Sequence, residues 1–216
     1  MIKLEKELNY IEEELINMAS VVTEMLYESI KALKDFDTKK CERVIEEDEK
    51  VDNIEIEIES KVIRAIALYQ PEGEILRKLV MAIKINKDFE RIGDHSVNIA
   101  SNILKTINLG KVEIPEEIEK IFNIITIMIN KTMRAFVDHN SNLAKEVIEM
   151  DKEIDSMRDK GIRKIIEESK VEKDIEKTLL LILTFKDLER IGDLLTNICE
   201  GIVYIVEGKI VEHKYK

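Results

Sequence analysis

The stretch that decides the fold is KDFERIGD at residues 87–94, because it recurs almost unchanged as KDLERIGD at residues 186–193. Seven of the eight positions are identical, and the two copies are offset by 99 residues. The similarity continues beyond the motif, since Asn98 corresponds to Asn197 at the same offset. Self-similarity of this length indicates a chain built from two related structural units.

The composition favours helices throughout both units. Among 216 residues there are only 7 Gly and 2 Pro, no Trp, and 5% aromatic residues, which leaves little turn and strand chemistry for an all-β fold. Apolar residues recur at steps of four and three, as in Leu4, Leu8, Ile11 and Leu15, which is the spacing of a helix bundle. The sequence predicts an all-α protein with six helices, over about residues 4–34, 38–69, 74–107, from 115 onward, 141–169 and 172–206.

The repeat and the helices together predict the domain organisation. Long helices joined by short connections, such as the one around Gln70-Pro71, are typical of antiparallel bundles. We therefore expect two tandem, similar three-helix bundles, at residues 1–109 and 110–216. Upstream of the motif the offset is 103 residues, so the second unit is four residues shorter, about where the first has its connection at residues 70–73.

Charge and cysteine usage exclude several classes of function. Lys and Arg number 34 against 45 Asp and Glu, a net charge of −11 that argues against broad nucleic-acid binding and suits cations or a basic partner. Cys41 and Cys199 stand far apart and indicate neither a disulfide framework nor a zinc site. The N-terminus is rich in Glu, unlike a signal peptide, and no apolar run approaches the ~20 residues of a membrane span. These features favour a cytoplasmic protein.

Four acidic pairs form the main candidate site. Each pair is spaced i, i+4, which places both carboxylates on one face of a helix, and the pairs follow helical seams that otherwise carry apolar residues. At ~6 Å and an effective dielectric of 20, each like-charge contact costs about 3 kcal/mol, so facing pairs need protons, Lys or Arg partners, or a cation. The candidate metal ligands are Asp48, Asp52, Glu90, Asp94, Asp151, Asp155, Glu189 and Asp193.

Oxygen-only ligands suit hard cations, and several bridging carboxylates suit a polynuclear cluster. Lys87, Arg91, Lys186 and Arg190 are the alternative, since they lie near enough to form ion pairs with the acidic residues. Gly93 and Gly192 lie in helix interiors, where glycine is unfavourable, and indicate close backbone packing or ligand access.

Asn98 and Asn197 lie one turn beyond the acidic pairs, where they would hydrogen-bond either a ligating carboxylate or a neighbouring helix. The sequence shows no nucleophile–base constellation, no Gly-rich phosphate loop and no Glu-x-x-His motif, so we assign no catalytic residue. His95 corresponds to Leu194 in the second unit and is therefore expected to be satisfied or exposed rather than a ligand.

With its doubled ERIGD motif, each copy preceded by an Asp-x-x-x-Asp pair and followed by Asn, the chain resembles the PhoU family of phosphate-uptake regulators over about residues 5–207. The resemblance implies two three-helix bundles with multinuclear sites for iron, zinc, manganese or magnesium at the eight acidic residues. It implies a cytoplasmic, non-enzymatic negative regulator of phosphate uptake and phosphate-starvation signalling. The implied partners are the ATPase subunit of a high-affinity ABC phosphate transporter and a phosphate-sensing histidine kinase, so the chain would be peripheral to the membrane.

Two alternatives stay open at this point. The same carboxylate clusters would serve a metal-dependent hydrolase or oxidase, although no general acid or base stands out beside them. The accessory proteins of low-affinity phosphate permeases are similar in outline, but the doubled ERIGD is not expected there. Self-association into a homodimer is also open.

Overall fold

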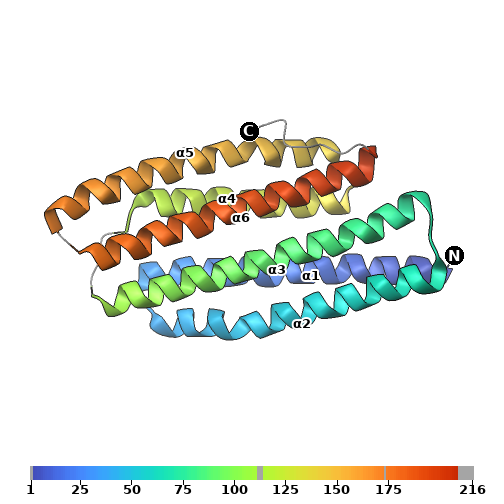
Figure 1. The fold of residues 1–216 in the computed structure, drawn as a ribbon, viewed down its shortest axis with the longest axis horizontal. Helices are drawn as coiled ribbons and strands as arrows, with labels where there is room; N and C mark the ends of the chain where they lie inside the picture. The colour runs from blue at the N-terminus through green and yellow to red at the C-terminus, as the bar shows by residue number, and fades with distance from the viewer. Residues whose placement is uncertain (1, 111–113, 173, 209–216) are drawn as a thin grey trace.

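Six long helices run roughly parallel to the long axis of the molecule (Figure 1). The structure is a computed structural model that describes residues 2–110, 114–172 and 174–208, and in these ranges it contains helices and no strand. The helices are α1 (Ile2–Asp35), α2 (Thr38–Tyr69), α3 (Gly73–Asn108), α4 (Glu116–Val137), α5 (Ser141–Glu172) and α6 (Ile175–Glu207). The predicted all-α fold is confirmed.

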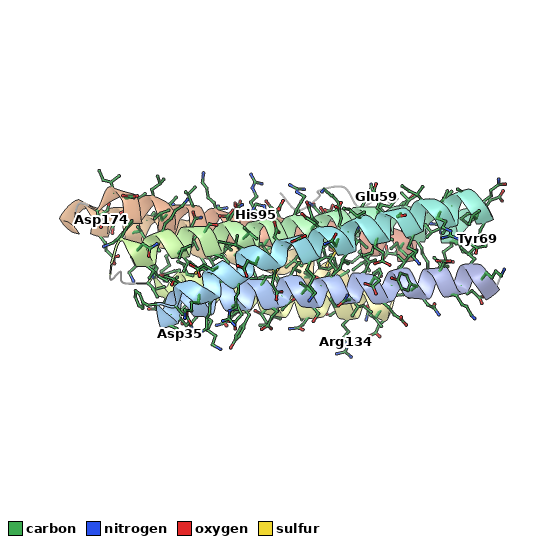
Figure 2. The ribbon with its side chains drawn as sticks, turned by 90° about the horizontal axis from the view of Figure 1, so that it is seen from below. Asp35, Glu59, Tyr69, His95, Arg134 and Asp174 are labelled. Atoms are coloured by element: carbon green, nitrogen blue, oxygen red, sulfur yellow. The ribbon has the colours of Figure 1, made fainter. Side chains whose placement is uncertain are left out.

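The helices form two three-helix bundles that lie side by side. Helices α1, α2 and α3 pack on one another, as do α4, α5 and α6, and the bundles meet mainly where α3 contacts α6, with a smaller contact between α1 and α4. Figure 2 shows Asp35 and Asp174 toward one end of the molecule, Tyr69 at the other, and His95 near the middle of its length. The division at residues 109 and 110 falls between α3 and α4 and stays a prediction.

Local chemistry explains where several helices begin and end. The Asp37 side chain accepts a hydrogen bond from the Lys39 backbone N–H at 3.0 Å and caps α2. Gln70 adopts a left-handed conformation and ends α2. The sequence placed the start of the last helix near residue 172, but it begins at Ile175 because the Asp174 side chain accepts from the Lys177 N–H at 3.2 Å.

The core confirms the seams of α1 and α4. In α1, Leu15, Met18, Val22 and Met25 are buried at the predicted four-three spacing. In α4, the buried residues at the same spacing are Ile118, Ile121, Ile125, Met128 and Thr132. In the described part of the chain, no helix combines the length and the apolar character needed to cross a bilayer.

The predicted seams of α3 and α6 differ from the core that these helices form. In α3 the buried stripe runs through Leu79, Ile85, Phe89 and Ile92. Val80, which the four-three spacing places on one seam with Glu90 and Asp94, is instead 42% exposed. Each of these helices packs against both other helices of its own bundle and also forms the main contact with the other bundle, so its apolar face is wide and a four-three seam can be traced along its edge. The carboxylates of α3 and α6 therefore lie at the rim of the bundles rather than inside them.

Candidate metal centres

The first acidic cluster lies between α2 and α3. Asp48 is half-buried on the seam of α2, whereas Asp52 and Asp94 are exposed. Burial raises the pKa of the Asp48 carboxyl, and the neighbouring charges of Asp52 and Asp94 raise that pKa further. The structure thus brings predicted residues from both helices close enough to repel one another.

Glu90 joins the same cluster and is only 14% exposed. Its Oε1 lies 3.0 Å from Lys87 Nζ, which also lies 3.4 Å from Glu55 Oε1. Its Oε2 is buried and has no hydrogen-bond partner among the residues that the structure describes. Burial raises the pKa of Glu90, Lys87 opposes this, and Asp94 and Glu55 add to the rise. The sequence reasoning missed Glu55, although Glu55 follows Asp48 on the seam of α2.

The second acidic cluster lines a groove of about 660 Å³ between α5 and α6. All four predicted residues of this repeat line the groove: Asp151, Asp155, Glu189 and Asp193. Asn197 lies at the same groove, and Arg91 and His95 of α3 line it from the other bundle. The second set of candidate ligands therefore shares one solvent-accessible space.

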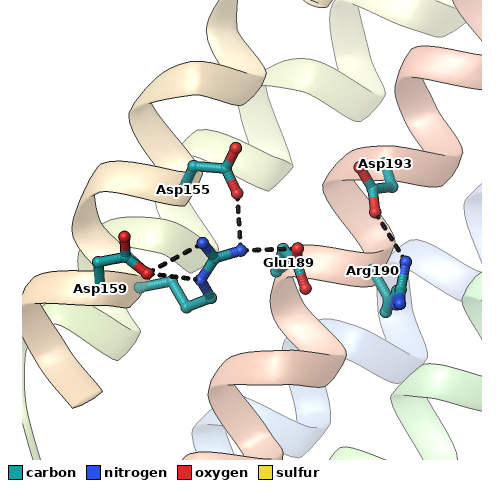
Figure 3. A network of polar contacts seen from close by, with 6 residues as sticks. Asp155, Asp159, Glu189, Arg190 and Asp193 are labelled. Carbon is teal, nitrogen blue, oxygen red and sulfur yellow. Dashed lines mark hydrogen bonds and ion pairs between the residues drawn. The ribbon is translucent and has the colours of Figure 1, made fainter. Parts of the chain in front are cut away.

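An arginine that sequence reasoning missed lies in this second cluster. Arg158 contacts three carboxylates, at 2.7 Å to Asp155, 2.9 Å to Asp159 and 2.6 Å to Glu189 (Figure 3). The contact with Glu189 links α5 to α6. Charge-assisted hydrogen bonds of this kind are stronger than neutral ones, so Arg158 neutralises much of the cluster.

The two glycines of the repeated motif differ in what they allow. A Cβ at Gly192 would lie 2.7 Å from Asp151 Oδ1, so the absence of a side chain lets this carboxylate lie against α6. A Cβ at Gly93 would instead meet Val51 Cγ1 at 3.3 Å. Close helix packing therefore explains Gly93, whereas Gly192 also admits a candidate ligand.

The asparagines and His95 complete the surroundings. Asn98 and Asn197 are exposed, and within the described residues neither donates a hydrogen bond to a carboxylate, so their supporting role stays a prediction. His95 Nδ1 lies 2.9 Å from Asp187 Oδ1, and Asn102 donates to Asp187 Oδ2 at 3.4 Å. His95 is thus satisfied by a contact between α3 and α6, as its lack of a counterpart suggested.

The donor set fits a hard cation better in the first cluster than in the second. As the side chains stand, no three acidic, histidine or cysteine residues of the described ranges converge as a metal-binding group. The first cluster nevertheless offers only oxygen donors, with a buried, unpartnered oxygen on Glu90. The second already holds the guanidinium of Arg158. The eight residues remain candidate ligands.

The sequence matches the model of the PhoU domain twice, over residues 15–103 and 118–202. The chain belongs to the PhoU family. A PhoU homologue of Clostridium acetobutylicum, named a phosphate-specific transport system accessory protein, is 34% identical over 96% of both chains.

Two solved structures share the fold over nearly the whole length. The crystal structure of the phosphate transport system regulatory protein PhoU from Streptococcus pneumoniae superposes with a TM-score of 0.90 at 26% identity and covers 97% of this chain and 99% of that one. PhoU from Pseudomonas aeruginosa superposes with a TM-score of 0.91 at 27% identity, covering 95% and 99%.

The PhoU domain occurs twice, which confirms the internal repeat inferred from the two ERIGD motifs. PhoU proteins are accessory and regulatory proteins rather than enzymes, which confirms that prediction and removes the hydrolase and oxidase alternative. The names of these relatives refer to a phosphate-specific transport system or to a phosphate transport system, and not to a low-affinity permease.

Proposed function

We propose that this chain is a cytoplasmic accessory protein that restrains a phosphate-specific transport system, and the expression of phosphate-starvation genes, when phosphate is plentiful. The observation that carries the proposal is the full-length match to a relative named for that system, at 34% identity over 96% of both chains. The acidic surface and the lack of a catalytic constellation support an adaptor, which acts by binding other proteins.

The proposed partners are the ATPase subunit of the transporter and a phosphate-sensing histidine kinase. The chain would reach the inner face of the membrane through them, since none of its described helices is suited to span a bilayer. Two similar bundles side by side offer two related surfaces, which suits a protein that serves two partners.

The proposed metal sites brace the bundles. A multivalent cation bound by Asp48, Asp52, Glu90 and Asp94 would supply the positive charge that these carboxylates lack and thereby hold α2 against α3. The raised pKa of Asp48 and the unpartnered oxygen of Glu90 support this assignment, because Asp48 is half-buried beside other carboxylates and Lys87 contacts only one of the two oxygens of Glu90. Elemental analysis decides whether the cation is iron, zinc, manganese or magnesium.

The adaptor role is tested in the organism that carries the gene. Deleting the gene is expected to switch on phosphate-starvation genes in phosphate-rich medium, and restoring the full chain is expected to switch them off. The metal-loaded chain is also expected to capture the transporter ATPase subunit in a pull-down. Unchanged gene expression after deletion, or repeated failure of the capture, would contradict the proposal.

The metal role is tested by elemental analysis of protein purified without a chelator. Glu90→Ala and Asp94→Ala are expected to lose metal relative to the natural chain. Glu59→Ala is the matched control, because Glu59 is an exposed acidic residue of α2 away from the cluster. Equal metal content in all four proteins would count against the first cluster as a metal site, while leaving the adaptor role untouched.

A further inference from the structure

One position distinguishes the two acidic clusters. At the offset of 103 residues that aligns α2 with α5, Asp52 corresponds to Asp155, and Glu55 corresponds to Arg158. Both residues are half-buried. Both residues also lie near the corresponding Glu of the next helix. Lys87 contacts both Glu55 and Glu90, whereas Arg158 contacts Glu189 directly. The swap of Glu for Arg changes the charge of the cluster by two units.

The ion pairs of the two clusters differ in the way that this exchange of Glu for Arg predicts. In the second cluster, Arg158 pairs with Asp155 and Glu189, while Arg190 donates to Asp193 at 3.1 Å. Arg158 thus contacts Asp155 of its own helix, α5, and Glu189 of α6. The protein therefore compensates three of the four candidate ligands of this repeat with its own arginines.

The first cluster has no such compensation. Among the described residues, neither Asp48, Asp52 nor Asp94 forms an ion pair, and only Lys87 reaches Glu90. Arg91, which corresponds to Arg190, lies 3.8 Å from Asp88 instead of pairing with Asp94. Three candidate ligands of this repeat are thus left without a protein cation.

A guanidinium is a fixed cation with donors only, so it cannot ligate a metal and repels one at short range. The Arg158 side chain is only 20% exposed, and its contacts with three carboxylates hold the guanidinium in place. A metal ion that used Asp155 and Glu189 would have to displace these contacts and then remain near a positive charge. The first cluster presents no comparable obstacle.

We propose that Arg158 is a built-in cation of the second acidic cluster, so that the two clusters are not equivalent: the first takes multivalent metal ions, and the second binds them much more weakly. The inference rests on the proposed metal binding and adds which repeat binds and which residue decides it. The candidate ligands of the two clusters match one for one, so the expected difference in affinity comes from Arg158.

The deciding experiment titrates Mn²⁺ into the full, chelator-stripped chain and measures affinity and number of sites by calorimetry and by the spectroscopic signal of free Mn²⁺. The background variant Glu90→Gln/Asp94→Asn disables the first cluster, so binding reports the second alone. On that background, Arg158→Gln is expected to tighten Mn²⁺ binding by about tenfold or more, since a nearby unit charge is removed. Unchanged affinity would overturn the proposal.

Two matched variants separate charge from general damage. Arg134→Gln removes an exposed arginine of α4 that pairs with Asp138 at the same helix end, and it is expected to leave Mn²⁺ binding unchanged. Arg158→Lys keeps the charge and is expected to leave binding as weak as in the background protein. The reciprocal change, Glu55→Arg in the natural chain, is expected to weaken binding at the first cluster. Tightening by Arg134→Gln, or by Arg158→Lys as much as by Arg158→Gln, would overturn the role of the charge.

A metal-free measurement is independent of any binding. In the presence of a chelator, Arg158→Gln is expected to lower the melting temperature more than Arg134→Gln. In a separate measurement without chelator, added Mn²⁺ is expected to restore part of the loss. Equal melting temperatures of the two variants would overturn the built-in cation. If neither the natural chain nor any variant binds Mn²⁺, both this inference and the proposed metal sites fail, whereas unchanged binding in Arg158→Gln alone defeats only the inference.

Discussion

Replacing Asp88 by Asn is expected to stabilise this protein at neutral pH. Asp88 lies on α3 at the contact with α6, its side chain is 18% exposed, and burial raises the pKa of its carboxyl from 3.8 to about 6, against the opposing effect of Arg91. A folded-state pKa above the unfolded value means that the folded protein holds this proton more tightly. The stability that comes from the protonated form is therefore present below about pH 4 and lost as the pH rises to about 6.

The size of the effect follows from the shift. A rise from 3.8 to about 6, at about 1.4 kcal/mol per pKa unit, corresponds to about 3 kcal/mol. Partial contact with solvent reduces this, so we expect the Asn variant to gain about 2 kcal/mol at pH 7 and little at pH 4. Asn has the shape of the protonated acid, so the Asp88→Asn variant and the natural chain differ chiefly in this one charge.

The repeat supplies the control. Asp187 is the counterpart of Asp88 in α6, but it is paired with His95 and accepts a hydrogen bond from Asn102. Asp187→Asn removes a charge-assisted contact and is expected to cost about 1 kcal/mol at pH 7. The same substitution at equivalent positions thus has opposite signs.

The assay is urea unfolding of both variants and the natural chain at pH 4, 5, 6 and 7, with a chelator present throughout. The difference between Asp88→Asn and the natural chain should grow across this range. A constant difference, or destabilisation by Asp88→Asn at pH 7, would refute the assignment of the raised pKa to burial of a carboxyl that Arg91 compensates only in part.

Further outcomes follow from packing. A Cβ at Gly161 would lie 2.3 Å from Cζ of the fully buried Phe185 ring, so Gly161→Ala should lower the free energy of unfolding by about 2 kcal/mol despite the better helix propensity of Ala. At Gly201 the added Cβ would meet the flexible end of the Met81 side chain. Gly201→Ala should therefore leave the free energy of unfolding unchanged or raise it by up to about 1 kcal/mol in the same urea assay. Burial raises the pKa of the Cys41 thiol to about 11 and that of Cys199 to about 12, so neither should react with a disulfide reagent at pH 8 until the protein is unfolded; rapid labelling of the folded chain would contradict their burial.

The helices and the repeat were predictable because both depend on local patterns. The α1 seam through Leu15 and Met18 is unambiguous, since one side of that helix faces the core. Helix α3 contacts α1, α2 and α6, and its apolar residues cover so wide a face that a seam through Val80 looks as regular as the true one through Leu79. Periodicity therefore located the helix but not its inward direction.

The acidic site was predictable as a set of residues and not as a set of contacts. The repeat alignment pairs Asp48 with Asp151, and the structure indeed places each at the contact between two helices. Arg158 stands in an acidic run, where an arginine reads as an exposed partner for its neighbours, and its bond to Glu189 depends on how α5 meets α6. The link between His95 and Asp187 spans 92 residues and depends on how the bundles dock.

The two repeats differ in charge compensation at two places, and at both it is the second repeat whose carboxylates are compensated by other side chains. At the contact between bundles, His95 and Asn102 of the first repeat serve Asp187, whereas Leu194 and Gly201 at the corresponding positions offer Asp88 no side-chain donor. In the acidic clusters the second repeat again receives the compensation, through Arg158. Uncompensated negative charge is therefore concentrated on the α2–α3 side of a chain with a net charge of −11. Because protons and metal ions compete for the same carboxylates, metal binding at the first repeat should release protons and grow stronger as the pH rises.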